Sequence, residues 1–111
     1  MAFKGDLEAL ILGVLNGATL HGYEIAKRIR EGGGEAFAVG EGRLYPALHK
    51  LESDGKIVGK WEPREGKPPR RIYELTEGGH RELQEQQAAW KSFASGVGSI
   101  LFAGAPEVTR G

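Results

Sequence analysis

The sequence contains no cysteine and only one methionine among its 111 residues. The absence of cysteine excludes disulfides, thiolate metal sites and cysteine nucleophiles, and makes the cytoplasm the default expectation. Long hydrophobic runs are also missing. The one apolar run near the start, residues 10–15, is too short to span a bilayer, and Asp6 and Glu8 argue against a signal peptide. We therefore expect no membrane partner.

Catalytic motifs are missing as well. The chain has no GxxxxGK[ST] loop, no serine elbow and no acid/base cluster, and its glycine run at residues 32–34 follows a predicted helix, not a strand. His21, Glu24 and His80 lack close metal-ligand spacing on a common face. We expect neither an enzyme nor a metal or other cofactor.

No charge of one sign predominates, since the formal net charge is zero, and this disfavours an indiscriminate polyanion binder. The cations are nevertheless unevenly distributed. Between residues 56 and 71 there are two carboxylates and six cations, a local net charge of +4: Lys56, Lys60, Arg64, Lys67, Arg70 and Arg71. The positive charge is therefore concentrated in one segment.

The length and a hydrophobic content of 40% predict one domain with one compact core. A first helix is expected from an N-cap at Asp6 to a stop at Gly17, with apolar residues at helical spacing. A second helix is expected over HGYEIAKRIRE, residues 21–31, ended by the glycine run, with His21 helping to start it. Residues 35–40 are expected to form a loop from which Phe37 and Val39 can touch the core.

A third helix is predicted from about Glu41 to about Asp54, with Gly55 as its left-handed terminator. Pro46 fits only if this helix begins near residue 41 or 42. The helical spacing places one set of side chains in the core, namely Leu44, Leu48 and Leu51, and leaves another set exposed, namely Arg43, His49 and Lys50.

Two short strands are predicted over residues 56–62 and 70–75, separated by PREGKPP, which is expected to continue neither strand and to form a long, basic, proline-stiffened tip. Thr76 is a good N-cap for a helix over residues 77–102. Residues 103–111 are expected to be a disordered tail.

Three helices, a two-stranded ribbon and a long helix are the element order of a winged helix-turn-helix with an added C-terminal helix. The fold class is thus α+β, mainly α with a small β-hairpin. We expect a winged helix-turn-helix DNA-binding domain at residues 1–76 and a dimerisation helix at residues 77–102. In this architecture the third helix enters the major groove and the ribbon reaches an adjacent groove or the phosphates.

Four motifs carry a resemblance to a known family: LEALILGVL, HGYEIAKRI, GRLYPALHKLESDGKI and RRIYELTEGG, in this order. The chain resembles the PadR family of transcriptional regulators over about residues 5–82, and its short C-terminus is similar to the small subfamily with a single dimerisation helix. The resemblance implies a homodimeric, usually repressing protein that binds double-stranded DNA and is released by a small molecule or stress. The family commonly has a small hydroxyl residue where this chain has Arg43, so a different operator is expected.

The candidate DNA-binding residues are Arg43, Tyr45, Pro46, Lys50, Arg64, Lys67, Arg70 and Arg71. Arg43 is placed to reach a guanine edge. Each polar member has a simpler interpretation as a solvated residue, and Tyr45 is either packed against the ribbon with its hydroxyl on a phosphate or part of the core. For a dimer, the site is expected to be an inverted repeat.

The long helix carries a candidate effector or dimer interface at Leu83, Trp90, Phe93, Val97 and Leu101. Packing between two copies is one interpretation of this stripe. The resemblance also implies another, in which Trp90 and Phe93 of two copies line a pore for a planar hydrophobic molecule. The alternative function is a winged-helix protein–protein association module that does not bind specific DNA.

Overall fold

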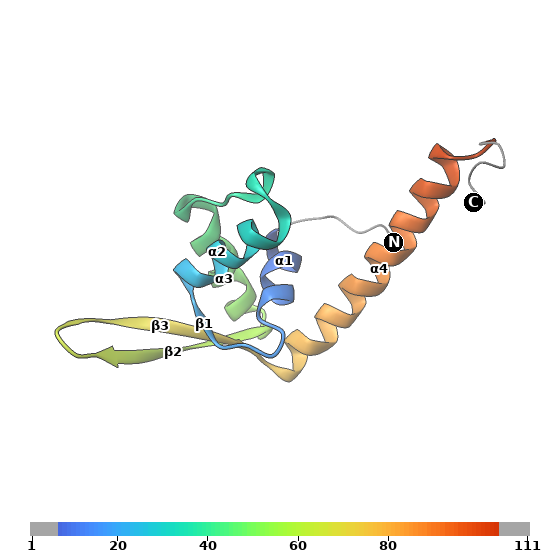
Figure 1. Cartoon of the computed structure of the whole chain (residues 1–111). Helices are drawn as coiled ribbons and strands as arrows, with labels where there is room; N and C mark the ends of the chain where they lie inside the picture. Colours follow the sequence, from blue (N-terminus) through green and yellow to red (C-terminus); the bar gives the residue numbers. More distant parts are fainter. Residues whose placement is uncertain (1–6, 105–111) are drawn as a thin grey trace.

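The structure is a computed structural model that describes residues 7–104. Within these residues, four α-helices, a short 3-10 helix and three strands follow one another along the chain (Figure 1): α1 Leu7–Val14, β1 Leu20–His21, α2 Gly22–Gly33, η1 Glu35–Phe37, α3 Glu41–Ser53, β2 Ile57–Arg64, β3 Lys67–Leu75 and α4 Glu77–Leu101. The predicted α+β class and helix order are confirmed. The predicted N-cap at Asp6 and residues 105–111 of the predicted tail lie outside the described residues.

Local capping explains where two of the helices begin. The His21 side chain accepts a hydrogen bond from the Glu24 backbone amide, and the Glu24 carboxylate accepts one from the His21 amide. The Thr76 hydroxyl oxygen accepts a 3.0 Å hydrogen bond from the Gly79 amide at the start of α4. Both predicted starts are therefore confirmed, with side chains satisfying amides that have no partner inside the helix.

The core lies where α1, α2 and α3 meet the base of the wing. Its fully buried side chains come from all of these elements: Ile11, Leu12, Leu15, Ile25, Leu44, Leu48 and Ile57. Leu51 is buried with them, so the predicted apolar face of α3 is confirmed. Burying this face fixes which side of α3 remains in water.

The sheet has three strands, where the sequence predicts two. β1 pairs with β3 in antiparallel register, with Leu20 opposite Tyr73, and the strand order is β1-β3-β2. A two-residue strand has too little alternation to be seen as a pattern. Its effect is to attach the start of α2 directly to the wing.

The wing, defined here as β2, β3 and their turn, extends further than predicted. The strands continue through PREGKPP, and a tight turn at Glu65 and Gly66 joins them, with Gly66 at φ +71°. The prediction of a long, strand-free tip is wrong. β2 is the edge strand, and β1 pairs only with residues 72 and 73 of β3, so the prolines lie where few amides are needed for pairing.

The segment between α2 and α3 also differs from the predicted loop. It contains η1, whereas Val39 after it packs partly against the core, as predicted. Phe37 lies close over Gly33, where an added Cβ would be 2.6 Å from the Phe37 ring. This segment therefore packs back on the end of α2.

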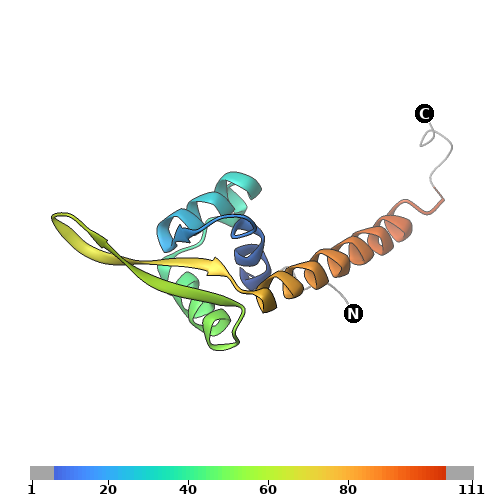
Figure 2. The ribbon, with the colours of Figure 1, turned by 90° about the horizontal axis from the view of Figure 1, so that it is seen from below.

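α4 is the least covered element. Its first turns pack on α1 and the wing base, and the remainder projects away from the body (Figures 1 and 2). The overall extents of 63 × 28 × 24 Å reflect this projection. Only Gly79 and Leu83 of the 25 residues are buried. Ala103 and Gly104 form a turn after its end.

Candidate nucleic-acid interface

The exposed side of α3 carries the four predicted contact residues of this helix: Arg43, Tyr45, Pro46 and Lys50. The helix begins at Glu41, as predicted, so Pro46 lies inside it one turn after Gly42 and lacks the amide that would bond to the Gly42 carbonyl. Gly42 is itself exposed. The same helix thus buries three leucines and presents a polar surface on the opposite side.

Arg43 and Lys50 differ in how free their charges are. Lys50 Nζ lies 2.8 Å from Asp54 Oδ2 one turn later. This hydrogen bond raises the pKa of Lys50 and lowers the pKa of Asp54. The Arg43 guanidinium makes no ion pair with any side chain in residues 7–104. Arg43 is therefore the cation of this face that a new partner can engage without breaking an existing pair.

Tyr45 is 45% exposed, so the interpretation of this residue as core is wrong. Its hydroxyl lies close over the first residue of α2, where a Cβ added to Gly22 would be 2.6 Å from Tyr45 Oη. The ring also lines a hollow shared with Trp61 and Tyr73 of the wing. Tyr45 thus stands where α2, α3 and the wing converge.

Most of the predicted wing cations have partners. Arg70 Nε lies 2.8 Å from Glu62 Oε1, Arg71 Nη2 lies 2.7 Å from Glu52 Oε2, and Arg64 Nε donates to the Pro68 carbonyl. Lys56 and Lys60 pair with two further carboxylates, Glu82 and Glu74. Among the described residues, neither Arg64 nor Lys67 pairs with a carboxylate, and of the six cations only Lys67 has a side chain with no hydrogen bond or ion pair. Carboxylates from outside residues 56–71 thus pair with cations of this segment and reduce its excess of positive charge.

Sequence reasoning did not single out two exposed aromatic side chains beside this surface. Tyr23 is 69% exposed near the start of α2 and stacks on His21 at a centroid distance of 6.3 Å. Trp61 is 65% exposed on β2, with the Arg71 guanidinium 5.2 Å from its ring centroid. For Trp61, the signal available in the sequence was a large aromatic residue on a predicted strand.

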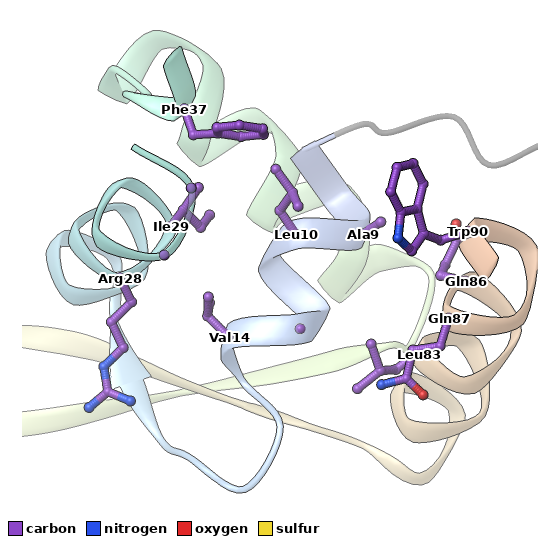
Figure 3. A pocket seen from close by; sticks show the side chains of 13 residues that line it. Ala9, Leu10, Val14, Arg28, Ile29, Phe37, Leu83, Gln86, Gln87 and Trp90 are labelled. Carbon is purple, nitrogen blue, oxygen red and sulfur yellow. The ribbon is translucent and has the colours of Figure 1, made fainter. Parts of the chain in front are cut away.

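A second surface lies on the other side of the body. A groove of about 590 Å³ runs over α1 between the α2–η1 corner and α4 (Figure 3). Phe37 and Ile29 line one wall, Leu10 and Val14 lie on α1, and Trp90 stands on α4. The lining is mostly apolar, which is unusual for a surface that faces water.

The predicted stripe on α4 divides into two parts. Leu83 is buried in the core of its own chain, so it is not free for a partner. Trp90 and Phe93 are exposed, with ring centroids 6.1 Å apart, and Leu101 is 69% exposed. Val97 is half-buried between them along the helix. The exposed part of the stripe therefore begins at Trp90.

No group of three or more metal-ligating side chains comes together in residues 7–104. Across the same residues, none of the helices has the length and apolarity needed to cross a membrane.

A three-helix unit with a wing and an exposed polar third helix defines a winged helix-turn-helix protein. The chain belongs to the transcriptional regulator PadR-like family, whose model matches residues 11–85. It is 33% identical over 78 residues to the transcriptional regulator Rv3488 of Mycobacterium tuberculosis, a match that covers 70% of this chain and 69% of that protein.

It is also 32% identical over 79 residues to the negative transcriptional regulator PadR of Bacillus subtilis. That match covers 71% of this chain but only 43% of the relative, so the chain spans less than half of that protein's length.

Solved structures agree with this membership. A PadR family transcriptional regulator from Eggerthella lenta has a TM-score of 0.77 at 31% identity, over 90% of this chain and 85% of that one. Bacillus subtilis PadR in complex with operator DNA has a TM-score of 0.67 at 31% identity, over 73% of this chain and 46% of that one. The PadR structures are winged-helix regulators, so the predicted family and fold are both confirmed.

Proposed function

We propose that this chain is a homodimeric transcriptional repressor that binds an inverted-repeat DNA operator through α3 and the wing. The observation that carries the proposal is the exposed polar face of α3 beside the wing, where Arg43 makes no ion pair with another described residue. A helix of this kind fits the major groove, and a ribbon next to it reaches the flanking backbone. The operator complex of the Bacillus relative supports DNA as the partner.

Within this function, the eight candidate contacts have different roles. Arg43 reads a base edge, because its guanidinium is free and forked. Tyr45 and Pro46 lie on the same exposed side, and Lys50 reaches a phosphate only by leaving Asp54. Lys67 is the wing cation most available to a phosphate, whereas Arg64, Arg70 and Arg71 also hold the wing together.

The repressing role follows the description of the Bacillus relative as a negative regulator. Residues 1–76 act as the DNA-binding unit and residues 77–102 as the dimerisation helix, in the cytoplasm where the DNA is. Ile100, Leu101 and Phe102 are 78%, 69% and 69% exposed at the end of α4. A second copy is the expected cover for so much apolar surface on a projecting helix.

Release from the operator is assigned to a planar hydrophobic molecule that stacks on Trp90, which lines the groove, and on the Phe93 ring 6.1 Å from it. Titration with planar aromatic compounds is expected to quench Trp90 fluorescence and weaken operator binding. If both signals stay constant across such compounds, the effector assignment is wrong.

Selection of bound sequences from random duplex DNA, repeated at two salt concentrations, tests the function directly. We expect an inverted repeat with half-sites about one helical turn apart, roughly 10 bp. The logarithm of the affinity should fall linearly with the logarithm of the salt concentration, because phosphate contacts release counterions. Absence of any enriched sequence, together with salt-independent association, would instead indicate a protein-association module.

A further inference from the structure

Glu52 makes contacts inside the protein that DNA binding does not require. Glu52 lies in the last turn of α3, on the side that faces the wing, and it is only partly exposed. Its Oε2 atom accepts two hydrogen bonds, one from each strand of the wing. The Gly59 amide of β2 donates at 3.1 Å and Arg71 Nη2 of β3 donates at 2.7 Å. One carboxylate oxygen therefore joins α3 to both strands.

The Gly59 bond satisfies an otherwise unpaired edge. β2 is the outer strand of the sheet, so one side of its backbone has no neighbouring strand. The Glu52 carboxylate takes the place of that strand at Gly59. Charge-assisted bonds to a carboxylate are shorter and stronger than neutral ones, which favours this arrangement over a water contact.

Gly59 is also what lets Arg71 reach Glu52. Gly59 pairs with Tyr73, and Trp61 pairs with Arg71, so these four residues share one face of the ribbon. A Cβ added at Gly59 would lie 2.8 Å from Arg71 Nε and 3.0 Å from Tyr73 Cε1. The arginine therefore crosses the strand through space that only glycine leaves open.

Arg71 in turn holds Trp61. Its guanidinium lies 5.2 Å from the Trp61 ring centroid while it bonds to Glu52. The Tyr73 ring lies on the same face, and burial raises the pKa of its phenol, with the nearby Arg71 charge acting in the opposite direction. The linked set of Glu52, Gly59, Arg71 and Trp61 is called the wing clamp here.

We propose that Glu52 is a positioning residue that fixes the angle between the wing and α3 through the wing clamp, before any DNA is bound. Arg71 acts inside the clamp, and its bond to Glu52 must be broken before it contacts a phosphate. The clamp sits between the exposed face of α3 and the exposed ring of Trp61, so it sets the spacing of the two surfaces that meet DNA. This inference rests on the proposed DNA-binding function. Its energetic basis is preorganisation, because a wing that is already ordered loses less entropy on binding.

The test uses the full chain and four variants. Glu52→Ala removes the shared acceptor, and Glu52→Gln keeps one acceptor oxygen but removes the charge. Gly59→Ala retains every charged group and displaces Arg71 by its methyl alone. Asp54→Asn is the matched control, because it removes a carboxylate at the end of the same helix that pairs with Lys50 and not with the wing. Circular dichroism checks that each variant is folded.

The first measurement is made without DNA. Backbone ¹⁵N relaxation and the indole resonance of Trp61 report on the order of the wing and on its contact with Arg71. We expect the wing amides of Glu52→Ala and Gly59→Ala to become more mobile, with Glu52→Gln intermediate and Asp54→Asn unchanged. Wild-type wing dynamics in both Glu52→Ala and Gly59→Ala would overturn the clamp.

The second measurement is affinity for the selected operator. Removing a negative charge near DNA should by itself strengthen binding. We expect the opposite for Glu52→Ala and Gly59→Ala, a loss of about 10-fold, because the wing must then be ordered on binding. Asp54→Asn should bind as well as the wild type or better. A wild type that binds no duplex overturns the proposed function, whereas tight wild-type binding retained by Glu52→Ala overturns the positioning role alone.

Discussion

At the scale of single residues, the environment of each cation decides what it can do. Within residues 7–104 no carboxylate pairs with Arg43, whereas Lys50, on the same face of α3, is held by Asp54 at 2.8 Å. On the wing, Lys67 is unpaired within the described residues and Arg70 is not. Exposed ion pairs contribute little to stability. Each pair must nevertheless break before its cation can contact a phosphate. Free and paired cations should therefore behave differently in DNA binding.

Arg43→Ala is expected to relax preference at one base position in each half-site, at a cost of about 1–3 kcal/mol for the preferred base. Lys67→Ala is the comparison, because a phosphate contact carries no sequence information. It should weaken binding to all duplexes alike and reduce the salt slope by about one. Binding of each variant to a panel of single-base operator variants makes this distinction. An equal loss on every duplex for Arg43→Ala would contradict base reading.

The ion pair between Glu82 and Lys56 makes part of the stability of the fold depend on pH. Its hydrogen bond from Lys56 Nζ at 2.8 Å lowers its pKa below the ordinary value of 4.5, with help from Gln86. The folded state therefore holds this proton less readily than the unfolded chain does. The pair stabilises the fold above pH 4.5, and this contribution is lost as the pH falls through the lowered pKa.

Glu82→Gln should accordingly lower the free energy of unfolding by about 0.5–1 kcal/mol at pH 7 and by less at pH 3. Urea denaturation at the two pH values measures the difference between variant and wild type. Glu85→Gln, at an exposed position of the same helix, serves as the control and should have little effect at either pH. A deficit for Glu82→Gln that is equal at both pH values would contradict the assignment.

At the scale of elements, the junction between the wing and α4 is close-packed backbone. The Thr76 hydroxyl donates to the Gly55 carbonyl at 2.6 Å, and Gly79 lies against the Lys56 carbonyl. Gly55 itself ends α3 with φ +74°, which an L side chain rarely adopts. The end of α3, the wing base and the start of α4 thus meet at glycines. Their relative placement depends on the absence of side chains there.

Gly79→Ala should be strongly destabilising, by about 2–4 kcal/mol, because a Cβ would collide with the Lys56 carbonyl oxygen and backbone cannot easily move away. Its neighbour provides the control. A Cβ at Gly78 would be 3.4 Å from the nearest atom, so Gly78→Ala should be close to neutral. Thermal denaturation of the two variants compares the positions. Similar melting temperatures would contradict this account of the junction.

At the scale of the whole molecule, the body and α4 have opposite characters. The body buries most of its leucines and isoleucines on itself, whereas Ile100, Leu101 and Phe102 are exposed at the far end of α4. A helix of 25 residues is about 37 Å long, more than one small body can cover. Two copies joined along α4 would bury this surface and point two α3 helices at one duplex.

Leu101→Glu is expected to convert a dimer into a monomer at micromolar concentration, because it places a charge in the apolar stripe. Ser99→Glu introduces the same charge on the opposite side of the same turn and should leave the dimer intact. Sedimentation velocity distinguishes the two results. A monomeric wild type, or dissociation caused equally by both variants, would contradict dimerisation through this stripe.

Much of the secondary structure could be predicted from residue patterns, because helix formation, capping and termination depend on interactions between residues close in the sequence. Helical spacing of Leu44, Leu48 and Leu51, capping at His21 and Thr76, and the terminator at Gly55 depend on neighbours within a turn or two. The element order, the family and the buried face of α3 could therefore be predicted. The two-residue strand β1 and the pairing of the prolines in the wing could not, because strand pairing depends on distant segments.

What only the tertiary structure decided is which charges and aromatic rings remain free. The sequence by itself determined that six cations lie between residues 56 and 71, but folding brings Glu52, Glu74 and Glu82 to them from other elements. An ion pair across the fold requires long-range proximity, which no local pattern encodes. The sequence indicated where this surface lies. In the part of the chain that the structure describes, the fold leaves the side chains of Arg43 and Lys67 without an ion pair and binds Arg71 to Glu52.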